Sequence, residues 1–315
     1  MIRTLIAAAL AAALAVPAVA EDWTPPGPIT LKIAFRAGGG ADTQARLIAD
    51  ELEARHGWQI IPENVTGRGG AVLAADMVDD PADGTVIGMV VTETFGYNRA
   101  ATRNPGYTIE DFTFLTTTAG FQMGIVALAG SGYETFADVI AAAEAGEEIS
   151  FGAMSQRLAD GAYLLGRENG VAFNVVGGLR GGRGVMNALT AGDIDIGWVA
   201  GIQAGPVQAG EMVNLASGIG RPLDISPDAP LTADFGVPYS MGGNFVFVAP
   251  AGLSDEAAAA ITAAIVEIVE DPATEVNQFI SRGFGGTEVV TGDALLARVE
   301  EEAAQAEAML ADAAN

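Results

Sequence analysis

Cysteine is absent from the 315-residue sequence, and histidine and lysine each occur once. Without cysteine the chain has no disulfides, no thiolate metal ligands, no cysteine nucleophile and no lipid-modified N-terminal cysteine. His56 is the single imidazole, so a metal site would have to be built from carboxylates, and the acidic residues show no EF-hand spacing. We therefore expect no metal and no cofactor.

Signatures of catalysis are also missing. The sequence contains no G-x-S-x-G nucleophile motif. His56 is expected at the end of a helix, next to Gly57, where a histidine most simply interacts with the helix C-terminus. Acidic pairs such as 79–80 and 193–195 lie at the ends of expected elements, and we interpret them as surface charges. We expect no catalytic residue and no enzyme; an exported hydrolase that uses two carboxylates is the alternative.

Long apolar stretches are confined to the start of the chain. Arg3 precedes an apolar run over residues 5–16, and the small residues 18–20 follow it. This pattern is typical of a secretory signal peptide over residues 1–20, cleaved after Ala20. The run is too short for a stable membrane anchor. In a bacterium the mature protein is therefore expected free in the periplasm, with no direct membrane insertion.

Positive charge is scarce, and the net charge is −25 at pH 7. Such acidity disfavours nucleic acid and anionic membrane surfaces as partners. It also repels an anionic ligand at long range, although salt screens that repulsion within roughly 8–10 Å. An anion site in this chain must therefore supply local positive potential.

The most informative stretch is a run of three glycines, 38–40, between a predicted strand and a predicted helix. The pattern predicts a strand over residues 29–35 and an amphipathic helix over residues 42–55, with Asp42 as its N-cap. Backbone N–H groups at such a helix start, together with the helix dipole, suit a phosphate or a carboxylate. The alternative is a glycine-rich turn that binds nothing.

Two nucleotide-binding motifs do not fit this loop. A dinucleotide fingerprint that starts at Gly38 needs glycine or alanine where Thr43 stands. A P-loop needs a lysine after its last glycine, and the single lysine, Lys32, lies in the predicted strand. Carboxylate is therefore favoured over phosphate as the bound anion.

Strands and helices alternate along the rest of the chain in two series. After the glycine loop the first series has strands over 58–65 and 85–91 and a helix over 71–78. The second series has strands over 124–129, 148–152, 173–176 and 194–199 and helices over 133–145, 158–169 and 185–191. The C-terminal part has a strand over 245–250 and helices over 255–270, 274–282 and the end of 289–315. This alternation predicts parallel sheets that are covered on both faces, whereas residues 98–118 show little pattern.

Three loops of the first series follow the carboxyl ends of strands, at residues 36–43, 66–71 and 92–94. In open α/β sheets, ligands bind beyond these strand ends. Each loop alone is explained by a tight turn or a solvated connection. Their convergence at one edge of a sheet favours a joint binding site.

Several motifs carry a resemblance to a known family. The first loop keeps the family pattern at Phe35, Gly38, Gly39, Asp42, Thr43 and Arg46. Further blocks match in order and spacing at 63–64, 67–70, 83–85, 152–156, 179–182 and 189–195. The chain resembles the periplasmic receptors of tripartite tricarboxylate transporters, the Bug-type solute-binding proteins. It departs from the pattern at Ala34, Arg36, Thr85 and Leu179 and lacks a usual histidine near Asp160, so ligand identity transfers less readily than the fold.

The resemblance implies an α/β fold of the two-lobed periplasmic binding protein class (type II, Venus-flytrap), with two crossover strands and a ligand cleft between the lobes. Lobe 1 is expected over 21–123 and 241–315, and lobe 2 over 124–240. The implied function is capture of a small organic carboxylate, such as a di- or tricarboxylate, and its delivery to the membrane subunits of a transporter. The protein is expected to be a monomer. The alternative is a carboxylate sensor read by a signalling receptor.

The expected binding residues come from both lobes. They are Arg36, Gly38, Gly39, Gly40, Asp42, Thr43, Gly69, Gly70, Thr92, Thr94, Ser155, Gln156, Arg180, Gly181 and Gly182. Asp42 is expected to act first as a helix cap, so that Asp42→Asn would keep binding. The Arg36 guanidinium either holds a carboxylate through two hydrogen bonds or pairs with a neighbour such as Glu63 or Glu93. Arg180 either faces the cleft or points to solvent.

Overall fold

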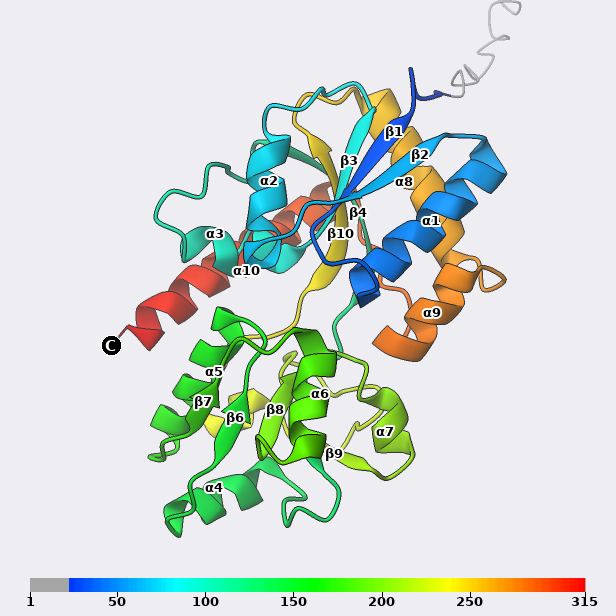
Figure 1. Cartoon of the computed structure of the whole chain (residues 1–315). Coiled ribbons are helices and arrows are strands. Elements are labelled where there is room, and N and C mark those ends of the chain that lie inside the picture. Colours follow the sequence, from blue (N-terminus) through cyan, green and yellow to red (C-terminus); the bar gives the residue numbers. More distant parts are fainter. Residues whose placement is uncertain (1–22, 315) are drawn as a thin grey trace, which may run out of the picture.

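The computed structural model describes residues 23–314, and these form two lobes, each built on a five-stranded sheet (Figure 1). The first sheet has the strand order β2-β1-β3-β10-β4, and the second has the order β7-β6-β8-β5-β9. The expected signal peptide and its cleavage after Ala20 lie outside the described residues. No helix within residues 23–314 is long and apolar enough to cross a membrane.

The first sheet is mixed, which corrects the expectation of a purely parallel sheet. Strands β1 (Ile29–Ile33), β2 (Ile60–Asn64) and β3 (Val86–Val91) run parallel to one another. Strand β10 (Asn244–Pro250) enters between β3 and β4 (Phe112–Gly120) and is antiparallel to both. Strand β4 immediately precedes the first chain crossing between the lobes, and β10 immediately follows the second, so both lie outside the parallel βαβ pattern.

Helices cover both faces of the first sheet because its strands are buried on both sides. In β3, Ile87 and Met89 pack in one core cluster and Val86 and Val90 in another, as the two-residue period of a strand requires. The first face is covered by α1 (Gly40–His56), α8 (Asp255–Glu270) and α9 (Glu275–Phe284). The second face is covered by α2 (Ala71–Met77) and the start of α10 (Gly292–Ala313), whereas the short α3 (Tyr97–Ala100) packs its buried Tyr97 into the core of the second lobe.

The second lobe is also a mixed five-stranded sheet with helices, but most of its strands are shorter. Its strands are β5 (Gly124–Leu128), β6 (Ser150–Gly152), β7 (Asn174–Val176), β8 (Ile196–Val199) and β9 (Met212–Ser217). Its helices are α4 (Phe136–Glu144), α5 (Gln156–Glu168), α6 (Gly181–Ala191) and α7 (Ala204–Gln208). Strand β6 is parallel to β7 and β8, whereas β5 is antiparallel to β8 and β9. The stacked rings of Phe151 and Trp198 lie at the centre of this core.

Three segments connect the lobes. The chain crosses from β4 to β5 through residues 121–123, and it returns to β10 through residues 241–243. Helix α10 is the third connection, because its first turns pack on the first lobe and its last turns enter the core of the second. The expected lobe boundaries at 123/124 and 240/241 stay a prediction.

The single lysine has a structural role. Lys32 lies in β1 with its side chain buried, and its Nζ is 2.7 Å from Asp76 and 2.5 Å from Asp80. Burial alone would lower the pKa of Lys32, but hydrogen bonds to Asp76 and Asp80 outweigh it and raise the pKa above its ordinary value. The cations available for an anionic ligand are therefore arginines.

Candidate ligand-binding site

The glycine loop after β1 is held by Asp42, although not as an N-cap. Strand β1 ends at Ile33, and α1 begins at Gly40 with Gly39 as its N-cap, so Asp42 is the third residue of the helix. Its carboxylate oxygen Oδ2 accepts a hydrogen bond from the backbone N–H of Gly38 at 2.9 Å. The side chain thus reaches back to the loop, as acidic residues at this helix position often do. The N-cap assignment was wrong.

Asp42 also ties the loop to β2. Its Oδ1 accepts from Arg46 Nε at 2.9 Å and from Asn64 Nδ2 at 2.8 Å, and Arg46 Nη2 donates to Asn64 Oδ1 at 2.9 Å. The Asn64 amide also donates to the Phe35 carbonyl at 2.8 Å. Burial alone would raise the pKa of Asp42, but the bonds from Asn64, Gly38 and Arg46 outweigh it and hold the pKa below its ordinary value. The Asp42 carboxylate is therefore occupied by the chain itself.

What this arrangement leaves open is the backbone at the start of α1. Gly38 and Gly39 are exposed, but their N–H groups donate to Asp42 and to the Arg36 carbonyl. The open donors are therefore the N–H groups of the first residues of α1, which have no partner within the helix. Thr43 donates its N–H to the Gly39 carbonyl at 2.9 Å, which closes the first turn. Arg36 lies in the loop, three residues beyond the end of β1, and its side chain is exposed. An anion would meet backbone donors and one guanidinium here.

The second predicted loop, at Gly69 and Gly70, is held by hydrogen bonds from residues in and just after the third predicted loop, 92–94. Thr94 donates its hydroxyl to the Gly69 carbonyl at 2.9 Å, and Asn98 Nδ2 donates to the same oxygen at 3.1 Å. Gly70 has a φ of 101°, and a Cβ added there would lie 2.4 Å from Thr94 Oγ1, so only glycine fits. Thr92 Oγ1 accepts the Asn244 N–H at 3.1 Å. A ligand contact for these two buried threonine side chains stays a prediction, because both hydroxyls are used within the chain.

The second lobe contributes two helix starts. Ser155 is the N-cap of α5, and its Oγ accepts the Leu158 N–H at 3.4 Å. Gln156 is exposed and donates to Asp160 Oδ1 at 2.8 Å. Helix α6 begins at Gly181, four residues earlier than predicted, so the Arg180-Gly181-Gly182 segment forms its first turn and carries no side-chain cap. Both starts follow the carboxyl ends of parallel strands, as the loops of the first lobe do.

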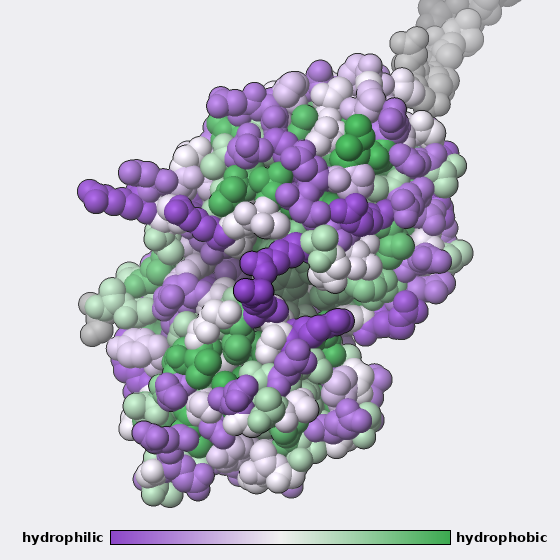
Figure 2. Space-filling view, in the orientation of Figure 1, coloured by the Kyte–Doolittle hydropathy of each residue, from purple (hydrophilic) through white to green (hydrophobic). Residues whose placement is uncertain are grey.

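Contacts between the lobes place these loops across one cleft. A Cβ added to Gly40 would lie 3.2 Å from the Phe284 ring, and one added to Gly201 would lie 3.3 Å from the same ring. One added to Gly182 would lie 3.2 Å from Ile202, so the start of α6 adjoins the loop after β8. The starts of α1 and α6 therefore flank the same space, and Figure 2 shows a hollow between the lobes with strongly hydrophilic side chains at its edges.

The opposite side of the interlobe boundary is tied by polar contacts that the sequence did not reveal. Arg157, in the first turn of α5, lies with Nη1 3.6 Å from Glu93 of the first lobe. Tyr97 donates its hydroxyl to Asp160, again between lobes. Arg157 directly follows the predicted Ser155 and Gln156, but nothing in the sequence distinguishes a buried interlobe arginine from a solvated one.

Several arginines with unpaired side chains lie on the loops and helix ends described above. Among residues 23–314, six arginines have no hydrogen bond or ion pair, and five of them lie on interlobe loops or helix ends: Arg36, Arg68, Arg180, Arg183 and Arg282. The sixth is Arg103, in the loop after α3. The predicted alternative for Arg36 is not found, because Glu93 pairs with Arg157 and Arg36 has no ionic partner within that range. In a chain this acidic, arginines without an acidic partner are the side chains that can supply local positive potential to an anion.

Two cavities lie at the lobe boundary, and none of the predicted binding residues lines either one. A cavity of ≈ 430 Å³ lies between α7 and the end of α9 and includes Gln122, Gly201 and Arg282. A cavity of ≈ 210 Å³ lies at the crossover segments against α10. No cluster of three or more acidic, histidine or cysteine side chains that could hold a metal ion occurs within residues 23–314.

A buried glutamate beside the second cavity makes a testable contribution to stability. Burial raises the pKa of Glu302, and a hydrogen bond from Thr92 opposes this shift only in part. A carboxyl with a raised folded-state pKa destabilises the protein increasingly as pH rises from its unfolded value through its folded value. We expect Glu302→Gln to shrink the fall in melting temperature between pH 5 and pH 8. The exposed neighbour variant Glu300→Gln serves as the control, and an unchanged pH dependence in Glu302→Gln would contradict the assignment.

Comparisons with known proteins agree with this architecture. The family model described as the tripartite tricarboxylate transporter family receptor matches residues 44–311. A UPF0065 protein from the gbd 5′ region of Cupriavidus necator is 28% identical over 258 residues, which cover 79% of this chain and 78% of that protein. A UPF0065 protein from the ttuE-ttuC′ intergenic region of Agrobacterium vitis is 34% identical over 127 residues, 39% of this chain and 36% of that protein.

Solved structures show the same fold. Rpa4515 of R. palustris with adipate has a TM-score of 0.78 at 22% identity and covers 92% of this chain and 98% of its own. MatC of Rhodopseudomonas palustris with bound malate has a TM-score of 0.74 at 20% identity, covering 91% and 100%. The periplasmic binding protein BugD has a TM-score of 0.76 at 20% identity, covering 92% and 99%.

The fold is the two-lobed α/β fold of periplasmic binding proteins. Within that class, the chain belongs to the receptor family of tripartite tricarboxylate transporters, because the family model matches most of its length. The resemblance expected from the sequence is confirmed. The chain is therefore a transport receptor and not an enzyme.

Proposed function

We propose that the receptor captures a small organic carboxylate between its lobes and presents it to the membrane subunits of a tripartite tricarboxylate-type transporter. The observation that carries this proposal is the gathering of unpaired arginines on both sides of the cleft of a protein with a net charge of −25. Two structures of similar fold are described with malate and with adipate, which supports the same ligand class.

The geometry explains how such a ligand would be held. The first lobe offers the Arg36 guanidinium and the backbone N–H groups at the start of α1, and the second offers Arg180 and the start of α6. Guanidinium groups bind carboxylates through paired, charge-assisted hydrogen bonds, and helix starts attract the same charge. A dicarboxylate or tricarboxylate can reach both sides, so its binding favours the closed arrangement of the lobes.

The remaining details belong to the same proposal. The mature chain begins after Ala20 and acts as a monomer free in the periplasm, where the receptor meets its transporter. The lobes close about residues 121–123 and 241–243, the two segments that link the sheets. Ligand and closure are coupled because only the closed form contacts the ligand from both lobes.

A ligand screen tests the function directly. We expect a subset of mono-, di- and tricarboxylates to raise the melting temperature, since a ligand at a hundredfold excess over Kd adds about 2.7 kcal/mol of stability. Neutral sugars and organic cations serve as matched negative probes at the same concentration. Native mass spectrometry of the purified protein would then identify a ligand retained from the cell. Stabilisation by sugars or cations, with no response to any carboxylate, would refute the proposal.

A further inference from the structure

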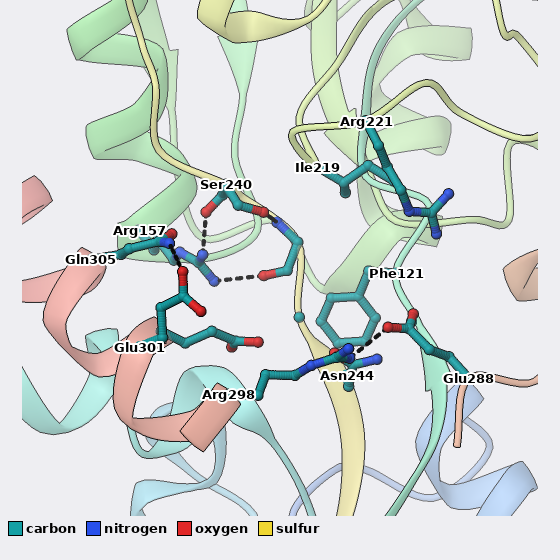
Figure 3. A pocket seen from close by; sticks show the side chains of 14 residues that line it. Phe121, Arg157, Ile219, Arg221, Ser240, Asn244, Glu288, Arg298, Glu301 and Gln305 are labelled. Atoms are coloured by element: carbon teal, nitrogen blue, oxygen red, sulfur yellow. Dashed lines mark hydrogen bonds and ion pairs between the residues drawn. The ribbon is translucent and has the colours of Figure 1, made fainter. Parts of the chain in front are cut away.

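The ≈ 210 Å³ cavity lies at the hinge itself, enclosed by the two crossover segments, α5 and α10 (Figure 3). Gly120 at the end of β4 and Phe121 of the first crossover line it, as do Gly242 of the second crossover and Asn244 at the start of β10. In Figure 3, Arg157, Glu301 and Gln305 lie on one side, and Arg221 lies on the other. We call this space the hinge cavity.

A row of aromatic rings stands between the hinge cavity and the glycine loop of the first lobe. Phe284, which adjoins Gly40, lies 5.0 Å from Phe245, and Phe245 lies 5.0 Å from Phe121, both in edge-to-face contact. Phe121 in turn lines the hinge cavity. None of the residues predicted to bind the carboxylate lines the hinge cavity, so the cavity is distinct from that predicted site.

Two buried donors at the hinge cavity lack partners. Arg157 is 8% exposed and Asn244 is 5% exposed, yet neither Arg157 Nε nor Asn244 Nδ2 has a hydrogen-bond partner within residues 23–314. The rest of each side chain is engaged: Arg157 donates to the carbonyls of Ser240 and Gly242, and Asn244 Oδ1 accepts from Arg298 at 3.2 Å. An unpaired buried donor costs about 1–3 kcal/mol, so an acceptor inside the cavity would be stabilising.

The hinge cavity also carries a negative group without a cation. Arg298 and Glu288 neutralise each other at 2.5 Å, and Arg221 pairs with Asp224 at 3.2 Å. Arg157 lies 3.6 Å from Glu93 outside the cavity lining. Two glutamates of α10 line the cavity with no ion pair among the described residues: Glu302, whose pKa is raised by burial, and Glu301, which accepts a hydrogen bond from Gln305 at 3.3 Å. A simple anion would satisfy the donors but face Glu301, and a simple cation would leave the donors unpaired.

We propose that the hinge cavity is a second ligand site, which binds a small zwitterion such as an α-amino acid or a betaine. The carboxylate of this ligand accepts from Arg157 and Asn244, and its cationic group faces Glu301. The volume equals about seven water molecules, enough for a molecule of that size. Because the walls come from both lobes and both crossovers, its occupancy alters the affinity of the cleft. This inference stands independently of the ligand class of the cleft.

Calorimetric titration of the full mature protein tests the proposal. The probes are glycine, L-alanine and glycine betaine, with propionate and ethylamine as matched molecules that carry only one of the two charges. We expect at least one zwitterion to bind, with a loss of tenfold or more in affinity in Glu301→Gln. Glu300→Gln, an exposed neighbour outside the cavity, is expected to bind like the wild type. Arg180→Gln removes a cleft guanidinium and is expected to leave zwitterion binding unchanged.

Several outcomes would overturn the site. The first is that no zwitterion binds at millimolar concentration, in which case water is the partner of the two donors. The second is that a zwitterion binds, but Arg180→Gln abolishes this binding and Glu301→Gln leaves it unchanged. Glu301 is exposed, so its variant is expected to fold, and an unchanged melting temperature verifies this. Linkage adds a second readout, because each ligand must change the affinity of the other by the same factor. Equal cleft affinity with and without the zwitterion would overturn the coupling.

Discussion

Replacing Asp42 with alanine is expected to lower the free energy of unfolding by about 2–3 kcal/mol, because Gly38, Arg46 and Asn64 would all lose their acceptor. The Arg46 side chain is 41% exposed, so solvent compensates part of its loss. The loop after β1 would also lose its only side-chain anchor to α1 found among the described residues, and carboxylate affinity is expected to fall with stability. Chemical denaturation and calorimetry measure the two effects.

The asparagine variant separates geometry from charge. Asp42→Asn keeps the shape but offers one acceptor oxygen to three donors, so we expect it to lose roughly half as much stability as the alanine variant. This replaces the expectation that asparagine would be a sufficient cap. The stabilising contribution of a carboxylate with a lowered pKa is complete above about pH 4 and is lost as pH falls through the folded-state pKa.

Acid unfolding provides the control for this interpretation. The stability advantage of the wild type over both variants is expected to shrink as pH falls below about 4, the ordinary range of an aspartate, and to vanish once the pH passes the lowered pKa of Asp42 in the folded protein. Asp50→Ala removes an exposed acidic residue of the same helix and serves as the matched variant. An alanine variant as stable as the wild type at pH 7 would show that the network carries no net stability.

Loss of the cleft arginines is expected to give the largest change in affinity. Removing a hydrogen bond to a charged group costs about 1.5–3 kcal/mol, which corresponds to about 10- to 100-fold in Kd. We expect Arg36→Ala and Arg180→Ala each to weaken carboxylate binding by that factor. The double variant is expected to lose about a thousandfold, because residues in opposite lobes with no shared protein partner contribute nearly additively. Isothermal titration with a carboxylate from the screen measures these values.

The melting temperature of the empty protein distinguishes a binding role from a structural one. Arg36 and Arg180 have no partner within residues 23–314, so their removal is expected to leave the apo melting temperature nearly unchanged. Affinity in the variants is also expected to depend less on salt, because fewer charges take part. Arg103→Ala, which removes the unpaired arginine outside the cleft, should bind like the wild type. Unchanged affinity in Arg36→Ala would assign the site to other groups.

Elements with strong local signals were predictable from the sequence. Helix α8 spans Asp255–Glu270 as expected, because Ser254 caps it, acidic residues begin it and apolar residues recur on one face. The buried run of β3 and the glycine turn after β1 carry equally local signals. The loops of the cleft followed from the rule that parallel strands end at one sheet edge.

Strand β4 was missed because its middle is polar. Thr116, Thr117 and Thr118 are all fully buried, which a hydropathy pattern does not indicate. The Thr116 hydroxyl donates to the adjacent Thr117 carbonyl, but the other two have distant partners: Thr117 donates to the Glu288 carbonyl at 2.6 Å, and Thr118 donates to Gln44. Such pairing depends on residues far along the chain. The antiparallel insertion of β10 is unpredictable for the same reason.

The hinge and the interlobe contacts were equally invisible to local patterns. Arg157 and Asn244 belong to different lobes, and their burial results only from the assembly of crossovers and α10. The role of Asp42 shows a milder form of this limit. The sequence predicted that Asp42 lies near the start of a helix. Its partner Asn64 lies on β2, and the two meet only because β2 pairs with β1 in the sheet.

The position of β10 between β3 and β4 dictates an order of assembly. The chain is made from its N-terminus, so β4 is complete long before its partner strand. That partner, β10, lies between β3 and β4 in the sheet and begins at Asn244, 124 residues after Gly120. The second sheet, complete at Ser217, has all its strands earlier. Contacts of such long sequence separation form slowly. All strands of the second sheet are therefore present before the first sheet can be completed, and β4 has no sheet partner until the last quarter of the chain, which carries β10, has been made.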